Sequence, residues 1–137
     1  MKRFGLLLCL LFFQSLAIAQ QAPAPPPEAQ SPIGYETVQD AFDALTADSA
    51  ATKSEYEGWT IFRQKGDGKY ILWSFIPDDH PVHPTAVRRE VVKKNGEVFI
   101  TMAVLCYSSR FDCDQLIEQF QRINQGIRER LASEANS

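Results

Sequence analysis

The spacing of apolar residues predicts a helix at each end of the folded part of the chain and strands between them. Apolar residues from Val38 to Leu45 recur at three- and four-residue steps, which is the period of one helical face. Thr37 and Asp40 have the spacing of a capping box at the start of that segment. We therefore predict a helix from Val38 to Ala47.

Short runs rich in aromatic and β-branched residues follow, separated by turn signals. The strongest turn signals are Gly66-Asp67-Gly68 and Asn95-Gly96, and the second is typical of a type I′ hairpin. The predicted strands are Thr52–Tyr56 as a short edge strand, Trp59–Arg63, Tyr70–Phe75, Ala86–Lys94 and Glu97–Cys106.

The Glu97–Cys106 run is apolar on nearly every side, which favours a strand in the middle of the sheet, covered on both faces. A polar turn at Tyr107–Asp112 separates it from an amphipathic C-terminal helix. Asp112 and Gln115 have the spacing of an N-cap and its N3 partner. The apolar stripe of this helix consists of Cys113, Leu116, Ile117, Phe120, Ile123, Ile127 and Leu131.

These segments together predict an α+β domain. It has an N-terminal helix, an antiparallel meander of four or five strands, and a C-terminal amphipathic helix packed on the sheet. The two helices most simply cover one face, which gives two layers. A bare second face would be an interaction surface and would allow a homodimer, although no pattern in the sequence fixes one.

The first 19 residues have the layout of a secretory signal peptide. Basic Lys2 and Arg3 precede the apolar run Gly5–Leu16, and Ala17–Ala19 forms a small-x-small cleavage site before Gln20. The apolar run is shorter than the roughly 20 residues of a membrane span. We therefore expect a periplasmic or secreted protein without stable membrane insertion after cleavage, and a retained N-terminal anchor is the alternative.

Residues 20–32 are rich in proline and alanine and predict an extended linker, so the single folded domain is assigned to residues 33–137. Cleavage removes Lys2 and Arg3 and changes the formal net charge from -3 to -5. An acidic, exported protein is not expected to bind nucleic acid.

Cleavage also removes Cys9, which leaves Cys106 and Cys113 in the mature chain. Two cysteines in an exported protein indicate one disulfide. Their spacing differs from the C-x-x-C motif of thiol oxidoreductases, so a structural bond is favoured over a redox role.

The loop between Trp73 and Pro84 carries the most suggestive chemistry. It contains both histidines of the chain, His80 and His83, each followed by proline, and they are preceded by Asp78 and Asp79. Imidazole and carboxylate ligands of this kind suit zinc or copper, with His80, His83 and Asp79 as the candidate ligands. A turn without a ligand is the alternative, because closed metal sites normally need four ligands.

The predicted hairpin also carries a group of basic residues, namely Arg88, Arg89, Lys93 and Lys94. They would attract an anionic partner, or they would discourage edge-to-edge aggregation of strands. Trp73 is a candidate ligand platform, although aromatic residues of small domains more often belong to the core.

One extended motif resembles a group of small exported proteins of Gram-negative bacteria that has no known activity. It consists of Gly58-Trp59-Thr60, then Leu72-Trp73-Ser74-Phe75-x-Pro77-x-x-His80-Pro81-x-His83-Pro84, and finally the Leu105-Cys106 and Cys113-Asp114 pairs. The resemblance spans about Gly34 to Leu131. It implies export, pairing of Cys106 with Cys113 and a compact domain, and it transfers no catalytic residues.

The sequence therefore favours a periplasmic, non-catalytic binding or interaction module with an unknown protein or cell-envelope partner and no cofactor. The candidate binding residues are Trp73, Asp78, Asp79, His80, His83, Arg88 and Arg89. The first alternative is a small metal-binding protein that uses His80 and His83. The second is a small hydrolase-like enzyme with an unrecognised site, for which no catalytic motif is present.

Overall fold

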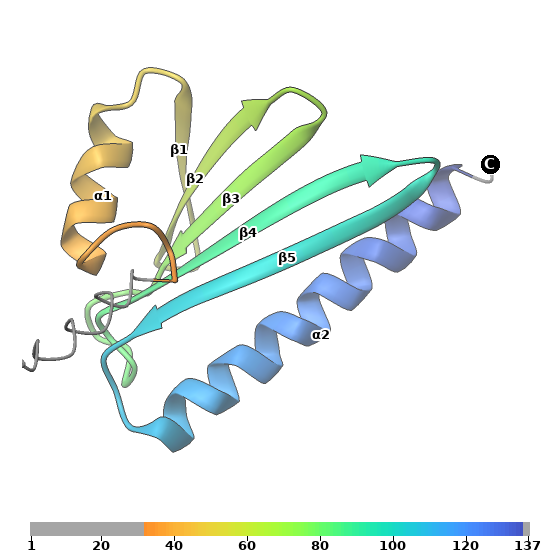
Figure 1. The fold of residues 1–137 in the computed structure, drawn as a ribbon. Helices are drawn as coiled ribbons and strands as arrows, with labels where there is room; N and C mark the ends of the chain where they lie inside the picture. The colour runs from red at the N-terminus through yellow and green to blue at the C-terminus, as the bar shows by residue number, and fades with distance from the viewer. Residues whose placement is uncertain (1–31, 136–137) are drawn as a thin grey trace, which may run out of the picture.

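The computed structural model describes residues 32–135, which form a five-stranded antiparallel sheet with two helices (Figure 1). The predictions for the signal peptide and for most of the linker lie outside the described residues. In chain order the elements are α1 (Val38–Ala47), β1 (Ala51–Tyr56), β2 (Trp59–Gly66), β3 (Lys69–Phe75), β4 (Thr85–Lys94), β5 (Glu97–Cys106) and α2 (Arg110–Ala135).

The strands form a meander, because their order in the sheet is the same as their order in the chain. Each pair of neighbours is antiparallel and is joined by a short turn or by the single longer loop between β3 and β4. Asn95 and Gly96 have φ angles of 54° and 80°, as a type I′ turn requires. The predicted α+β class, the five strands and this hairpin are confirmed.

Helix α1 also begins where the sequence predicts. The Thr37 side chain accepts a hydrogen bond from the Asp40 N–H at 3.0 Å, and the Asp40 carboxylate accepts one from the Thr37 N–H at 3.2 Å. This reciprocal pair is a capping box, which satisfies two backbone donors at the helix start. Val38, Ala41 and Leu45 form its buried face.

The two helices cover opposite faces of the sheet, so the expectation that both lie on one face of a two-layer domain was wrong. Alternate residues of a strand point to opposite faces, and the consecutive β4 residues Ala86 and Val87 belong to different cores. The core on the α1 side consists of Ile33, Val38, Ala41, Leu45, Phe62, Trp73, Phe75 and Ala86. The core on the α2 side consists of Ile76, Val82, Val87, Leu116 and Phe120.

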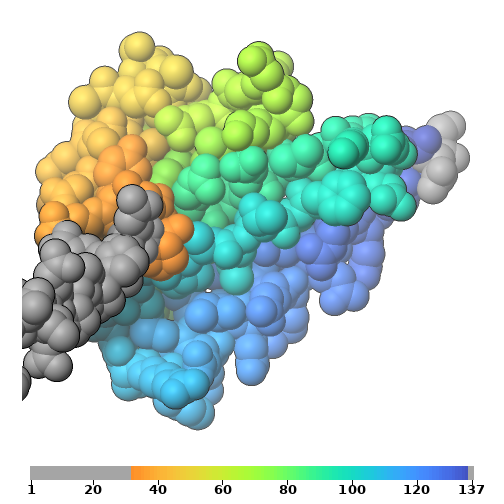
Figure 2. Space-filling view, in the orientation of Figure 1, coloured from red at the N-terminus to blue at the C-terminus, as the bar shows by residue number. Residues whose placement is uncertain are grey.

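Strand β5 lies at the edge of the sheet and not in its middle, which corrects the prediction made from its apolar character. Within residues 32–135 it pairs only with β4. None of its residues is fully buried, and Phe99 remains 49% exposed. Helix α2 covers one face of β5, while Phe99 and Thr101 remain exposed on the other face. Figure 2 shows atoms of β4 and β5 at the surface between the two helices.

Helix α2 begins earlier than predicted, because Ser109 provides the cap that was assigned to Asp112. The Asp112 N–H donates to Ser109 Oγ at 3.1 Å, and the Ser109 hydroxyl donates to the Asp112 carboxylate at 2.6 Å. Asp112 is therefore the N3 partner of this cap, and Gln115 lies beyond it. The buried stripe also differs, since Asn124 is buried whereas Ile123 is 42% exposed.

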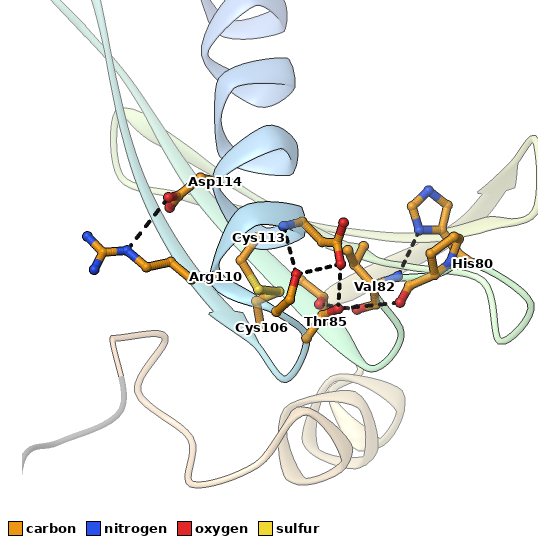
Figure 3. Close-up of a disulfide and its surroundings, with 11 residues drawn as sticks. His80, Val82, Thr85, Cys106, Arg110, Cys113 and Asp114 are labelled. Carbon is orange, nitrogen blue, oxygen red and sulfur yellow. Dashed lines mark hydrogen bonds and ion pairs between the residues drawn. A yellow bond between two sulfur atoms is a disulfide. The ribbon is translucent and has the colours of Figure 1, made fainter.

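A disulfide between Cys106 and Cys113 fastens the start of α2 to the end of β5, as predicted (Figure 3). The two Cα atoms are 6.1 Å apart, and seven positions separate the cysteines in the chain. No helix within residues 32–135 is long and apolar enough to cross a membrane.

Candidate functional site

The loop between β3 and β4 is held in place by hydrogen bonds to itself and by two buried anchors. Ile76 and Val82 are 5% and 4% exposed, and the Thr85 hydroxyl donates to the Val82 carbonyl at 2.5 Å. The His80 N–H donates to the Pro77 carbonyl and the His83 N–H to the His80 carbonyl, each at 3.0 Å. Two consecutive turns therefore fix the loop as a rigid support for its side chains.

These turns direct the two histidines into different surroundings. His80 packs edge-on against Trp59 with ring centroids 6.1 Å apart, and its Nδ1 accepts a hydrogen bond from the Val82 N–H at 3.3 Å. Together with Pro81 and α2 it lines a shallow hollow. His83 instead places Nε2 3.2 Å from Asp78 Oδ1. Both partners of this second contact are open to solvent.

The His83–Asp78 pair lies at the edge of a groove of about 940 Å³ between the loop and the start of α1. The partly buried Phe42 lines the groove in front of the buried Phe75, and their ring centroids are 5.2 Å apart. The other lining residues come from five segments of the chain, and they are Thr37, Val38, Gln39, Gly58, Thr60, Ile76, Pro77, Asp78, Asp79, His83, Pro84, Thr85 and Tyr107. This groove has about twice the volume of the hollow beside α2, which measures about 430 Å³.

The groove combines an apolar inner surface with an acidic rim. Aromatic and proline side chains line much of it, while Asp78 and Asp79 are the only charged carboxylates in its lining and no lysine or arginine contributes. The Tyr107 hydroxyl donates to the Glu36 carbonyl at 3.3 Å, which ties the far wall to the segment before α1. Such a lining attracts cations and apolar groups and repels anions.

The structure does not bring the candidate metal ligands together. His83 and Asp79 line the groove, whereas His80 lines the hollow beside α2. Residues 32–135 contain no group of three histidine, cysteine or acidic side chains that could hold a metal ion. His83 also makes no hydrogen bond to a serine, threonine or cysteine side chain in this part of the chain, which a catalytic triad would require.

Trp73 is a core residue with 3% exposure, so it offers no surface to a ligand. Its Nε1 donates to the Gln64 amide oxygen at 3.0 Å, and the Gln64 amide nitrogen donates to the Asp48 carboxylate at 2.6 Å. The Arg88 guanidinium lies 5.7 Å from the Trp73 ring centroid and pairs with Glu90 at 3.1 Å. The candidate binding residues Trp73 and Arg88 therefore both make contacts within the sheet.

Arg89 lies on the opposite face from Arg88, so the predicted basic patch is divided by the sheet. It is 7% exposed and donates to the Asn124 amide oxygen at 3.3 Å and the Ser74 hydroxyl at 3.4 Å. Its Nε has no acceptor within residues 32–135. Burial lowers the pKa of Arg89 because the apolar surroundings disfavour the charged form.

Sequence reasoning found Asp78, Asp79 and His83, but it missed the opposite wall of the groove. Thr37, Phe42 and Tyr107 come from segments far from the loop, and each had another explanation as a cap, a core residue or a turn residue. Only the placement of α1 on the sheet shows that they meet. Comparisons with protein-family models, curated proteins and solved structures gave no match, so the site is defined by the geometry of this chain alone.

Proposed function

We propose that the protein is an exported, non-catalytic binding module that holds a peptide segment in the groove between α1 and the β3–β4 loop. The observation that carries this proposal is the lining of that groove, which is apolar inside and acidic at the rim. The segment that fits best has an apolar side chain for the inner surface and a lysine or arginine for the rim. Export is supported by the disulfide and by the predicted signal peptide.

A rigid loop on a stable sheet is a suitable support for binding, because a prepared site loses little freedom when its ligand arrives. Phe42 and Phe75 are held by edge contacts within the core, and the loop is held by its two turns. The side chains of Asp78 and Asp79 remain exposed, and Asp78 contacts His83 through only one carboxylate oxygen, so both carboxylates can approach a cation. We therefore expect binding without a large change in backbone structure.

The test measures how a capped Phe-Lys dipeptide amide perturbs the amide resonances of the mature protein. A capped Phe-Glu dipeptide is the matched probe of opposite charge. The proposal predicts that Phe-Lys shifts resonances of the loop and of the first turn of α1, and that Phe-Glu shifts them much less. Equal shifts for both probes, or shifts confined to other surfaces, would contradict the proposal.

The acidic rim is tested by replacing both Asp78 and Asp79 with Asn. Loss of two exposed charges should weaken binding of the Phe-Lys probe by about threefold to tenfold, as expected for solvent-exposed ion pairs. The double variant Asp67→Asn and Glu134→Gln is the matched control, because it also removes two exposed carboxylates and both lie outside the groove lining. An equal effect of this control would show that only the overall charge matters.

A further inference from the structure

The two edges of the sheet differ in how well they are protected against pairing with another strand. Strand β1 has six residues and carries the charged residues Lys53 and Glu55. Strand β5 has ten residues in unbroken register with β4, and its only charge is Glu97 at the first position. Natural sheets usually blunt an exposed edge with charges, prolines, bulges or short strands. Strand β5 has none of these after Glu97.

The geometry of the β4–β5 hairpin shows which backbone groups of β5 face outward. Lys94 and Glu97 flank the two-residue turn, so they form a hydrogen-bonded pair, and such pairs alternate along an antiparallel ladder. The N–H and C=O groups of every second residue from Glu97 therefore point towards β4. Those of Val98, Ile100, Met102 and Val104 point away from it, along the free edge.

Helix α2 covers a face of the sheet and leaves this edge available. Val87 of β4 is completely buried beneath the helix, and Arg89 of β4 contacts both Phe120 and Asn124. Asn124 also contacts Met102 of β5, so α2 lies over β4 and β5 on one face of the sheet. On the other face Phe99 and Thr101 are exposed and continue the surface towards the edge.

We propose that the β5 edges of two copies of this chain pair antiparallel about Thr101, which joins two sheets into one of ten strands. A two-fold axis perpendicular to the sheet requires paired residues to lie on the same face. The register centred on Thr101 meets this requirement and joins outward-facing groups to outward-facing groups. It sets Thr101 opposite its own copy, Phe99 opposite Ala103, Ile100 opposite Met102 and Val98 opposite Val104.

The side chains favour a second copy as the occupant. On the face of β5 that points to the α1 side, the largest residue, Phe99, meets the smallest, Ala103, and a threonine pair at the centre is a favourable cross-strand contact. Val98–Cys106 contains no charged residue, so two copies approach this edge without bringing like charges together. A partner strand that carries charged side chains would find no residue of opposite charge within Val98–Cys106.

The test follows the association of the full mature chain by sedimentation velocity over a wide range of protein concentrations. The wild type should form a dimer as its concentration rises. Thr101→Lys should raise the dimer dissociation constant by about fivefold or more, because it places like charges directly opposite each other. The Thr101 side chain is exposed and faces Glu90 of the neighbouring strand, so a lysine is tolerated in the folded chain.

Thr52→Lys is the matched control, because Thr52 is an exposed residue on the opposite edge of the same sheet. It should leave association unchanged, and circular dichroism should show that both variants are folded. Thr101→Cys should form a disulfide-linked dimer on oxidation, since a non-hydrogen-bonded pair brings the two positions close together. A wild type that stays monomeric, a dimer that both lysines affect equally, or a Thr101→Cys protein that does not cross-link overturns the proposal.

Discussion

Arg89 is a charged side chain in the core beneath α2, where its partners are neutral. Asn124 and Ser74 accept its hydrogen bonds, and the Phe120 ring centroid lies 5.0 Å from its guanidinium carbon. No acidic side chain forms an ion pair with it within residues 32–135. A buried charge with incomplete hydrogen bonding is costly, so the fold depends on the acceptors that remain.

We predict that Asn124→Leu lowers the free energy of unfolding by about 1–3 kcal/mol, because it removes an acceptor of a buried charge. The double variant Arg89→Met and Asn124→Leu should regain this loss, since the remaining contacts are apolar. Urea denaturation of the wild type, both single variants and the double variant measures the coupling. Strictly additive effects would show that the two side chains do not depend on each other.

Glu90 should give part of the acid sensitivity of the fold. Lys69 Nζ lies 3.3 Å from one oxygen of its carboxylate and Arg88 Nη2 lies 3.1 Å from the other. The hydrogen bond from Lys69, with help from Arg88, lowers the pKa of Glu90, although partial burial acts in the opposite direction. The folded-state pKa is thus below the ordinary value of 4.5.

The carboxylate therefore stabilises the fold above pH 4.5, and this contribution is lost as the pH falls through the lower folded-state pKa. In the Glu90→Gln variant, the free energy of unfolding should fall less than in the wild type when the pH is lowered from neutral to below the folded-state pKa of Glu90. The measurement is denaturant unfolding at a series of pH values. Glu134→Gln, an exposed position near the end of α2, is the control and should follow the wild type.

At the level of single residues, composition indicated the chemistry of the loop but not the direction of each side chain. His80 and His83 are three positions apart with the same proline neighbour, yet two turns send them to different hollows. Arg88 and Arg89 were grouped because they are adjacent, although adjacent strand residues must point to opposite faces. Orientation depends on register and turn geometry, which one sequence does not fix.

The elements themselves were largely predictable, because their signals are local. The Thr37 capping box and the Asn95-Gly96 turn each act over a few residues and were confirmed. The position of β5 was not predictable from its apolar residues. A strand with two apolar faces is typical of the middle of a sheet, but β5 has this pattern at an edge, where a helix covers only one of its faces. The start of α2 was misplaced because Ser109 and Asp112 both resemble caps, and only hydrogen-bond geometry distinguishes them.

The cap of α2 can be tested by comparing Ser109→Ala with Asp112→Asn. Ser109→Ala should lower the free energy of unfolding by about 1 kcal/mol, the usual effect of losing a helix N-cap. Asp112→Asn should have a smaller effect, because the backbone donor of residue 112 to Ser109 Oγ is retained. Thermal unfolding of both variants measures the difference, and the reverse order would assign the cap to Asp112 after all.

The disulfide is an element-level clamp between β5 and α2. In the chain-entropy model, closing a loop of this length contributes about 2.5 kcal/mol to stability. Replacing Cys106 and Cys113 together with Ser should lower the free energy of unfolding by about that amount. Urea denaturation measures it, and an unchanged midpoint would show that packing alone holds the helix in place.

At the scale of the whole molecule, two short cores share one sheet. Helix α1 covers the part of one face formed by β2 and β3, while α2 covers the β4–β5 side of the other face. This diagonal arrangement creates both proposed sites. The groove forms where α1 meets the loop, and the free β5 edge remains because each helix is confined to one face.

The proposed export concerns the whole chain and has a direct test. Mass spectrometry of the protein purified from an oxidising compartment should give a mature chain that begins at Gln20 and has no free thiol. Full-length mass would favour a retained anchor. Two titratable thiols in the mature protein would contradict both the oxidising compartment and the structural role of the disulfide.

The meander has a consequence for how the chain reaches its fold. Every strand pairs only with strands next to it in the sequence, and the disulfide joins residues seven positions apart. Contacts that are this local need little loop closure, so folding is expected to be fast for a sheet protein. The same order lets each hairpin form as soon as its second strand is available, and α2 docks last. A chain that crosses a membrane unfolded, from its N-terminus onward, can therefore complete its sheet in the order in which it arrives.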